Sequence, residues 1–244
     1  MDAADIRQLA PTGTLRGGIV VAPAPSVFFA IHEDGAPRGV TVDLLTALAE
    51  ELQLPLALAI FPNSGELTEA VSQGVCDAAF MPQDAERAKK VDFGPAYYRI
   101  ESTFLVPAGS KLRTLAEANF PGARAIAIAN TTTARSARAF LTQGAVEEVR
   151  GVDEFTALAR ERKADLFALS RDAFETMLPH LPGARVLDGG FQHAGVACAV
   201  PKGRPAALAL FGGFIERAKK SGLVRRAFDR AGFANAAVAV AADG

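Results

Sequence analysis

One arginine stands where a bound anion would explain its position. Asp77 to Met81 is an apolar run of strand length, and Pro82, which has no backbone N–H to donate, closes it. Asp84 can cap a helix over residues 85–90, which places Arg87 in the first helical turn. A cation there opposes the helix dipole. We therefore expect either an arginine that holds an anion or a surface arginine paired weakly with Asp84.

A second polar turn has the composition of an anion site. Asn130 and Thr131, Thr132 and Thr133 follow a predicted strand and precede a predicted helix. The free N–H groups of a helix start, together with hydroxyl groups, bind carboxylates or phosphates. The alternative is plain N-capping, which threonine also performs. Arg87 from one side and this turn from the other would hold a carboxylate between them.

The motifs of the large enzyme classes are missing. The chain has no GxSxG, no GxxxxGK[ST], no GxGxxG after a strand and no HExxH. His32, His180 and His193 are scattered without a paired spacing, so we predict no metal site and no cofactor. Cys76 and Cys198 are far apart in apolar surroundings, which favours buried free thiols over a disulfide.

The elements that must position these residues alternate between strand and helix, which predicts an α/β fold with mostly parallel sheets flanked by helices. The main predicted strands are 15–22, 56–61, 77–81, 100–106, 125–129, 146–150, 165–169, 185–187 and 195–200. The main predicted helices are 42–52, 64–73, 85–90, 134–141, 153–162, 171–178, 205–220 and 223–230. A break at residues 107–110 separates two alternating series and marks a boundary between two lobes.

The two alternating strand–helix series share a short sequence similarity. Asp77 is followed seven residues later by Asp84, and Asp165 is followed seven residues later by Asp172, each time across a buried strand, a loop and a helix start. Open α/β sheets bind ligands outside the carboxyl ends of their strands. We therefore expect both lobes to turn equivalent strand ends toward one cleft.

Composition excludes several classes of partner. With 244 residues, half of them apolar, the chain can bury a substantial core. Its 26 Lys and Arg balance 27 Asp and Glu without a basic block, which indicates neither nucleic acid nor an anionic membrane. No apolar run is long enough to span a bilayer, and the start MDAADIRQLAPTG lacks the pattern of a signal peptide. We expect either a removed export signal or a leaderless cytoplasmic protein.

Three stretches carry a family resemblance: GAPRGVTVDLLTALAEEL at 35–52, DAAFMPQDAERAKKVDFGPAYY at 77–98 and PKGR at 201–204. Over roughly residues 15–233 the chain resembles the family 3 extracellular solute-binding proteins of ABC transporters, the amino-acid-binding type. The most specific part is T-x-x-R-x-x-x-x-x-F-S-x-P-Y-Y. Asp84, Arg87, Phe93 and Tyr97-Tyr98 match it here, with Gly94 in place of the usual serine.

The resemblance implies a type II periplasmic-binding-protein fold. It implies two lobes joined by crossover strands near 103–107 and 194–199, which close over the ligand by a hinge motion. The implied division is 14–105 with 196–244 for lobe 1 and 106–195 for lobe 2. A periplasmic location, a permease partner and a monomer are also implied.

Within such a cleft the resemblance implies that Arg87 grips the ligand carboxylate. The other candidate ligand contacts are Ser26, Phe28, Met81, Gln83, Glu101, Thr131, Thr132, Thr133, Ser170 and Arg171. The loop before Arg87 is shorter than in amino-acid binders, and Ser170 stands where the family has its ammonium-binding acid. This departure favours a carboxylate or dicarboxylate over a zwitterion, although Glu101 or Asp172 would accept an ammonium if it points inward.

Three functions remain open on these observations. The leading hypothesis is capture of a small carboxylate-bearing solute, an amino acid or organic acid, for an ABC importer. A second is an enzyme similar to cyclohexadienyl dehydratases, in which Glu101 is the general acid that acts on prephenate or arogenate. A third is an intracellular ligand sensor, similar to the effector domains of LysR-type regulators.

Overall fold

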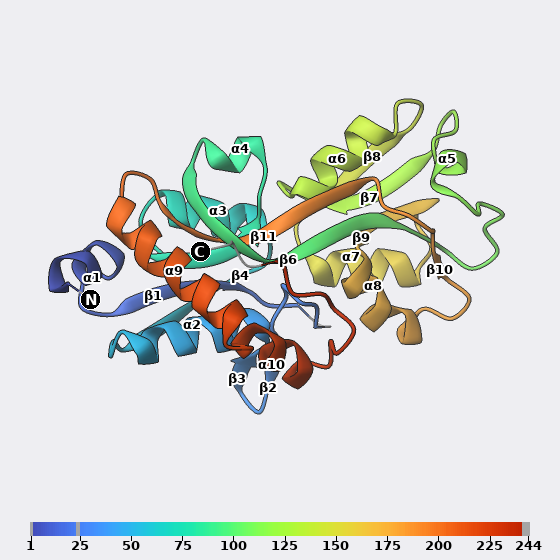
Figure 1. Ribbon diagram of the computed structural model, residues 1–244. Helices are drawn as coiled ribbons and strands as arrows, with labels where there is room; N and C mark the ends of the chain where they lie inside the picture. The colour runs from blue at the N-terminus through green and yellow to red at the C-terminus, as the bar shows by residue number, and fades with distance from the viewer. Residues whose placement is uncertain (1, 23–24, 241–244) are drawn as a thin grey trace.

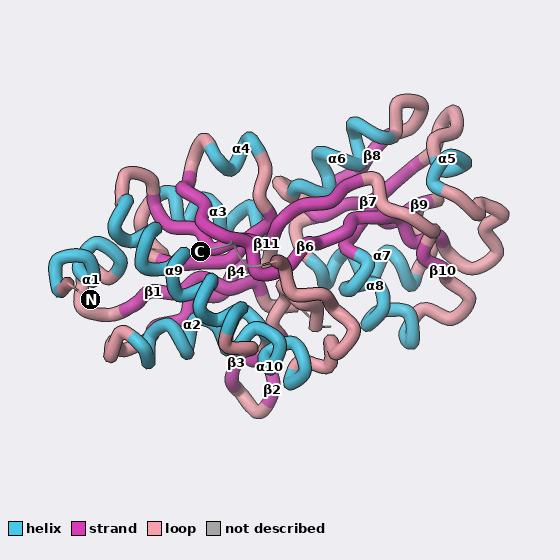
Figure 2. Tube along the Cα trace, in the orientation of Figure 1, coloured by secondary structure: helices cyan, strands magenta, loops and turns pink. Residues whose placement is uncertain are grey.

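The computed structural model describes residues 2–22 and 25–240. Residues 241–244, the last four of the predicted lobe 1, lie outside this range, as do residues 1, 23 and 24. Figure 1 shows an elongated molecule with two groups of helices, one at each end of a shared sheet. Figure 2 shows the strands running through the centre of both groups.

The alternation of strand and helix predicted from sequence is present. The strands are β1 (Leu15–Val20), β2 (Ile31–Glu33), β3 (Ala36–Arg38), β4 (Leu56–Phe61), β5 (Ala78–Pro82), β6 (Val91–Val106), β7 (Arg124–Ile128), β8 (Ala145–Val149), β9 (Leu166–Ser170), β10 (Arg185–Val186) and β11 (Gln192–Pro201). The α-helices are α1 (Ala3–Leu9), α2 (Val40–Glu51), α3 (Ser64–Ser72), α4 (Ala85–Ala88), α5 (Leu115–Ala118), α6 (Thr132–Phe140), α7 (Val152–Arg160), α8 (Arg171–Met177), α9 (Pro205–Lys220) and α10 (Leu223–Arg230), and a 3₁₀ turn covers Leu178–His180.

One sheet path passes through both lobes in the order β4-β1-β5-β11-β6-β9-β7-β8. At one end β4, β1 and β5 are parallel, and at the other end β9, β7 and β8 are parallel. The long strands β6 and β11 are antiparallel to each other and connect the two ends. The predicted α/β architecture is therefore confirmed, with a parallel group of strands in each lobe joined by two crossover strands into one continuous sheet.

The crossover strand β6 begins earlier than the sequence indicated. It starts at Val91 and not near Ile100, so the segment Phe93 to Tyr98 already lies in the sheet. Pro95 is accommodated because the β6–β11 pairing shifts register there: Ala96 pairs with Ala197 and Phe93 with Ala199. A proline tolerates such an irregular position because no ladder N–H is required of it.

The N-terminal segment is more ordered than expected. The polar composition of the residues up to Gly13 favours fraying or loose packing, but Asp2 caps α1 by accepting from the N–H of Ala4, and Leu9 at the end of the helix is fully buried. Helix α1 packs against α9. Burying an apolar side chain of this size stabilises the packed form by about 1.5–3 kcal/mol, which explains the difference.

Candidate functional site

A small cavity lies between the two lobes at the carboxyl ends of the parallel strands. Its volume is about 30 Å³, room for about one or two water molecules. The lobe 1 side is formed by Phe28, Phe29, Pro62, Asn63, Ser64, Pro82 and Ile100. The lobe 2 side is formed by Ile128, Thr131, Thr132, Thr133, Leu169 and Ser170. A larger ligand would enter only if the lobes moved apart.

Two helices begin at this cavity, one from each lobe. Asn63 caps α3 by accepting from the N–H of Glu66 at 2.8 Å, and Thr131 caps α6 by accepting from the N–H of Ala134 at 3.0 Å. Both caps line the cavity. The first N–H groups of a helix have no partner within the helix, and the helix dipole is positive at this end. The electrostatic environment therefore favours an anion.

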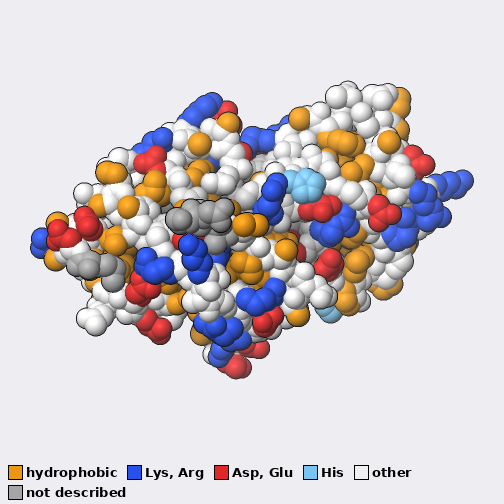
Figure 3. Space-filling view, in the orientation of Figure 1, with side chains coloured by type: hydrophobic (Ala, Val, Ile, Leu, Met, Phe, Trp, Pro, Cys, Tyr) orange, Lys and Arg blue, Asp and Glu red, His pale blue; other side chains and the backbone are white. Residues whose placement is uncertain are grey.

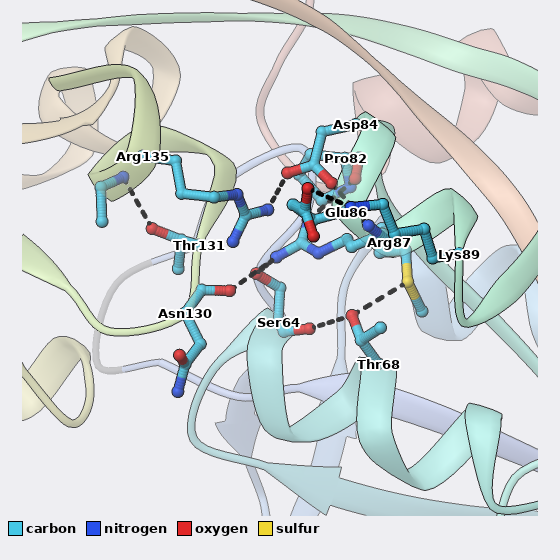
Figure 4. A network of polar contacts seen from close by, with 12 residues as sticks. Ser64, Thr68, Pro82, Asp84, Glu86, Arg87, Lys89, Asn130, Thr131 and Arg135 are labelled. Atoms are coloured by element: carbon cyan, nitrogen blue, oxygen red, sulfur yellow. Dashed lines mark hydrogen bonds and ion pairs between the residues drawn. The ribbon is translucent and has the colours of Figure 1, made fainter. Parts of the chain in front are cut away.

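Arg87 lies directly behind the lobe 1 wall of the cavity. Its side chain is buried, Nη1 donates to the Pro82 carbonyl at 2.8 Å, and Nη2 donates to Ser64 Oγ at 2.6 Å (Figure 4). Nη2 also reaches the Asn130 carbonyl of lobe 2 at 3.3 Å. In the described part of the chain Arg87 contacts no carboxylate through its guanidinium, and burial lowers its pKa to about 9. The cation is thus buried with neutral acceptors alone.

Asp84 does not neutralise this guanidinium. Its Oδ1 accepts from the backbone N–H of Arg87 at 2.8 Å, as the predicted N-cap requires, while its side chain forms an ion pair with Arg135 of α6. The weak Asp84–Arg87 surface pair, which was the alternative reading of the sequence, is therefore wrong.

The predicted threonine turn lies at the cavity. The Thr131 hydroxyl donates to the Ile128 carbonyl at 2.7 Å, and the Thr133 hydroxyl shares a hydrogen bond of 2.9 Å with Ser102. Thr132 is buried at the cavity wall, and so is Ser170 at the end of β9. The structure thus brings Phe28, Ser170 and the three threonines together at the cavity. Arg87 does not line the cavity itself but contacts Ser64, which does.

Three lobe 1 candidates, Ser26, Met81 and Gln83, do not line the cavity. The Ser26 hydroxyl accepts from the N–H groups of Phe28 and Phe29, which fixes the loop that presents both rings. Met81 is fully buried and accepts a hydrogen bond from Thr68 through its sulfur. Gln83 is turned away, toward the Gly94 carbonyl at 3.4 Å.

Glu101 and Arg171 are not brought to the cavity. They form an ion pair of 2.9 Å with each other, and Arg171 also donates to the carbonyls of Leu187 and Gly189. Asp172, the other acid considered for an ammonium group, is buried with Oδ2 accepting from the N–H of Val27 across the lobes at 2.8 Å. Burial raises the pKa of Asp172, with the Val27 N–H opposing the rise.

The helix starting at Ser64 was predicted, but its first residues were not predicted to line the site. Pro62, Asn63 and Ser64 directly follow β4, so the same strand-end rule that selected Thr131 to Thr133 after β7 would have found them. The apolar wall residues Phe29, Ile100, Ile128 and Leu169 carry no comparable signal, because core and pocket side chains have the same composition.

Both cysteines agree with the sequence expectation. Cys76 and Cys198 are free and buried, and burial raises the pKa of Cys76 to about 11 and that of Cys198 to about 12. Within residues 2–22 and 25–240, no helix has the length and apolarity needed to cross a membrane. The same ranges contain no cluster of His, Cys, Asp and Glu suited to a metal ion.

Residues 19–232 match the model of a family described as bacterial extracellular solute-binding proteins, family 3. The chain belongs to this family. The match covers the sheet of both lobes and the cavity between them, so the resemblance proposed from three short stretches is confirmed. Comparison of this solute-binding protein with curated protein sequences gave no significant match.

Solved structures of similar proteins confirm the type II fold. A mutant of ArgBP from T. maritima has a TM-score of 0.81 at 19% identity, covering 93% of this chain and 98% of that one. The substrate-binding protein AbpA from Streptococcus pneumoniae, bound to L-arginine, has a TM-score of 0.80 at 18% identity, covering 94% and 98%. The ancestral amino-acid-binding protein AncCDT-1, a precursor of cyclohexadienyl dehydratase, has a TM-score of 0.79 at 24% identity, covering 92% and 98%.

Proposed function

We propose that this solute-binding protein captures a small carboxylate-bearing molecule in the cavity between its lobes and delivers it to the permease of an ABC importer. The observation that carries the proposal is Arg87, a buried cation with no carboxylate partner in the described chain, bonded to Ser64 at the cavity wall. Burying an unpaired charge is costly, and a ligand anion nearby would compensate that cost.

The two lobes supply the contacts that this function needs. Lobe 1, taken as residues 14–105 and 196–244, contributes Ser64 and the start of α3, and lobe 2, taken as 106–195, contributes Thr131 to Thr133. A ligand anion held by both sides favours the closed form by its differential affinity for that form. Binding energy is thereby converted into lobe closure, the signal that a transporter can recognise.

We propose a monomer without catalytic activity that acts outside the cytoplasmic membrane. The absence of activity is supported by Glu101, the candidate general acid, which is held by Arg171 and does not line the cavity. The location and the permease partner rest on membership of an extracellular solute-binding family. Charges of both signs are mixed over the visible face, without a large block of one sign (Figure 3).

The function is tested first by thermal-shift screening of amino acids and organic acids, followed by isothermal titration of the best ligand. Arg87→Gln should weaken binding by about 10–100-fold, because a charge-assisted interaction of roughly 1.5–3 kcal/mol is lost. Arg185→Gln is the matched control, since Arg185 also donates to backbone carbonyls, those of Ser110 and Leu112, but lies far from the cavity. Unchanged affinity in a folded Arg87→Gln protein would contradict the proposed site.

A further inference from the structure

The cavity wall has polar groups but no charged side chain among its described residues. Its polar members are Asn63, Ser64, Thr131, Thr132, Thr133 and Ser170. Hydroxyl and amide groups can satisfy hydrogen bonds of a ligand without supplying a counter-charge. The charge preference of the cavity must therefore come from what lies directly behind this wall.

Arg87 and two helix N-termini lie directly behind the wall, while the nearby acids Glu66 and Asp84 are paired with Arg150 and Arg135. Ser64 Oγ accepts from Arg87 at 2.6 Å, which leaves the serine proton available to donate toward the cavity. Helices α3 and α6, each of nine residues, direct their N-terminal ends to the cavity from opposite lobes. These three contributions favour a carboxylate and disfavour an ammonium group at the same place.

The acids considered for an ammonium group do not line the cavity. Ser170 ends β9 at the cavity, and Asp172, two residues later, accepts from the N–H of Val27 through Oδ2, while its buried Oδ1 has no hydrogen-bond partner among the described residues. Glu101 is paired with Arg171. An ammonium group in the closed cleft would lose water without gaining a carboxylate partner, which is unfavourable.

The same arrangement limits the ligand to one carboxylate. Arg171 was the second cation expected to contact a dicarboxylate, but it is held by Glu101 and by the carbonyls of Leu187 and Gly189. The remaining wall is apolar and includes Phe28, Ile100 and Leu169. A second carboxylate would have to be desolvated against these side chains.

We propose that the ligand is a compact monocarboxylic acid without an ammonium group, such as a short 2-hydroxy, 2-oxo or unsubstituted acid with an apolar body. The juxtaposition of Arg87–Ser64, two helix N-termini and an acid-free wall carries this inference. It rests on the proposed function, whose ligand class it narrows.

The test compares ligands that differ only at the α-carbon. The protein is titrated calorimetrically with L-alanine, L-lactate, pyruvate and propionate, then with L-leucine and its 2-hydroxy, 2-oxo and unsubstituted analogues, and with succinate. We expect the best analogue in at least one series to bind about tenfold or more tightly than its amino acid, and more tightly than succinate. Ser170→Asp should shift that preference toward the amino acid, whereas Ser72→Asp at the exposed end of α3 should not.

The possible outcomes separate the inference from the function on which it rests. An amino acid, or succinate, that binds as tightly as or more tightly than the monocarboxylates overturns the inference and leaves the proposed function in place. If no carboxylate in the panel binds, both are overturned. If Ser170→Asp fails to fold, the wild-type series alone still decides the ligand class.

Discussion

Arg87 and Asn130 are in contact across the cleft: Nη2 of the arginine donates to the carbonyl oxygen of Asn130 at 3.3 Å. The same guanidinium is bonded to Ser64 and Pro82 within lobe 1. A second inter-lobe bond joins the Asn63 side chain to the Arg150 carbonyl at 2.8 Å. The two lobes are thus in direct contact beside the cavity, through Asn63 of the wall and Arg87 behind it.

Gly65 allows the lobes to approach this closely. A Cβ atom at position 65 would lie 2.4 Å from the Cβ atom of Asn130, too close for both lobes to keep their positions. We expect Gly65→Ala to weaken ligand binding by about tenfold or more, because overpacking costs on the order of 1–3 kcal/mol in the closed form alone. Titration calorimetry and small-angle scattering measure the affinity and the degree of closure.

The matched control for Gly65→Ala is Gly213→Ala, another helical glycine, whose added Cβ would contact only the flexible end of Arg217. That variant should bind ligand normally. Unchanged affinity of Gly65→Ala would show that the contact between α3 and Asn130 is absent from the ligand-bound state.

The raised pKa of Asp172 predicts that the stability of the fold depends on pH. Burial raises the pKa of its carboxyl in the folded protein above the ordinary value of 3.8. The folded state therefore retains this proton at pH values where the unfolded state has lost it. The resulting stabilisation is fully present below the unfolded pKa and is lost as the pH rises through the raised folded pKa.

Asp172→Asn removes this titration and keeps an acceptor for the Val27 N–H. We expect the melting temperature of the variant, relative to wild type, to increase as the pH rises from 4 to 7. Glu175→Gln, an exposed change on the same helix, should show no such trend. A difference between Asp172→Asn and wild type that is constant over this range would contradict the assigned pKa direction.

Cys198 occupies the space that a side chain at position 94 would need. A Cβ atom at position 94 would lie 2.6 Å from Cys198 Sγ. Gly94→Ser should therefore lower the free energy of unfolding by about 1–3 kcal/mol, as measured by urea denaturation. In a Cys198→Ala background the same substitution should cost less, and additive effects of the two changes would rule out this explanation.

The sequence was sufficient for the architecture because strand–helix alternation is a local property. Helices α9 and α10 have the bounds that the periodicity predicted, and Asp84 and Thr131 cap α4 and α6 as their residue types require. The strand-end rule also found the threonine turn and Ser170.

The side-chain partners could not be predicted in this way because they depend on distant contacts. Arg171 was assigned to the pocket from its position after β9, but Glu101 lies on the neighbouring strand and attracts it away. Arg87 was expected to face the ligand directly, whereas the short loop brings the Pro82 carbonyl and Ser64 between the guanidinium and the cavity. Only the three-dimensional structure fixes such competition between partners.

The most direct test of the proposed site is a crystal structure with the tightest-binding carboxylate. We expect the ligand carboxylate in the inter-lobe cavity, within hydrogen-bond distance of Ser64 Oγ and of a first-turn N–H of α6, with Arg87 still bonded to Ser64. A ligand bound outside this cavity, or one whose carboxylate contacts neither helix start, would contradict it.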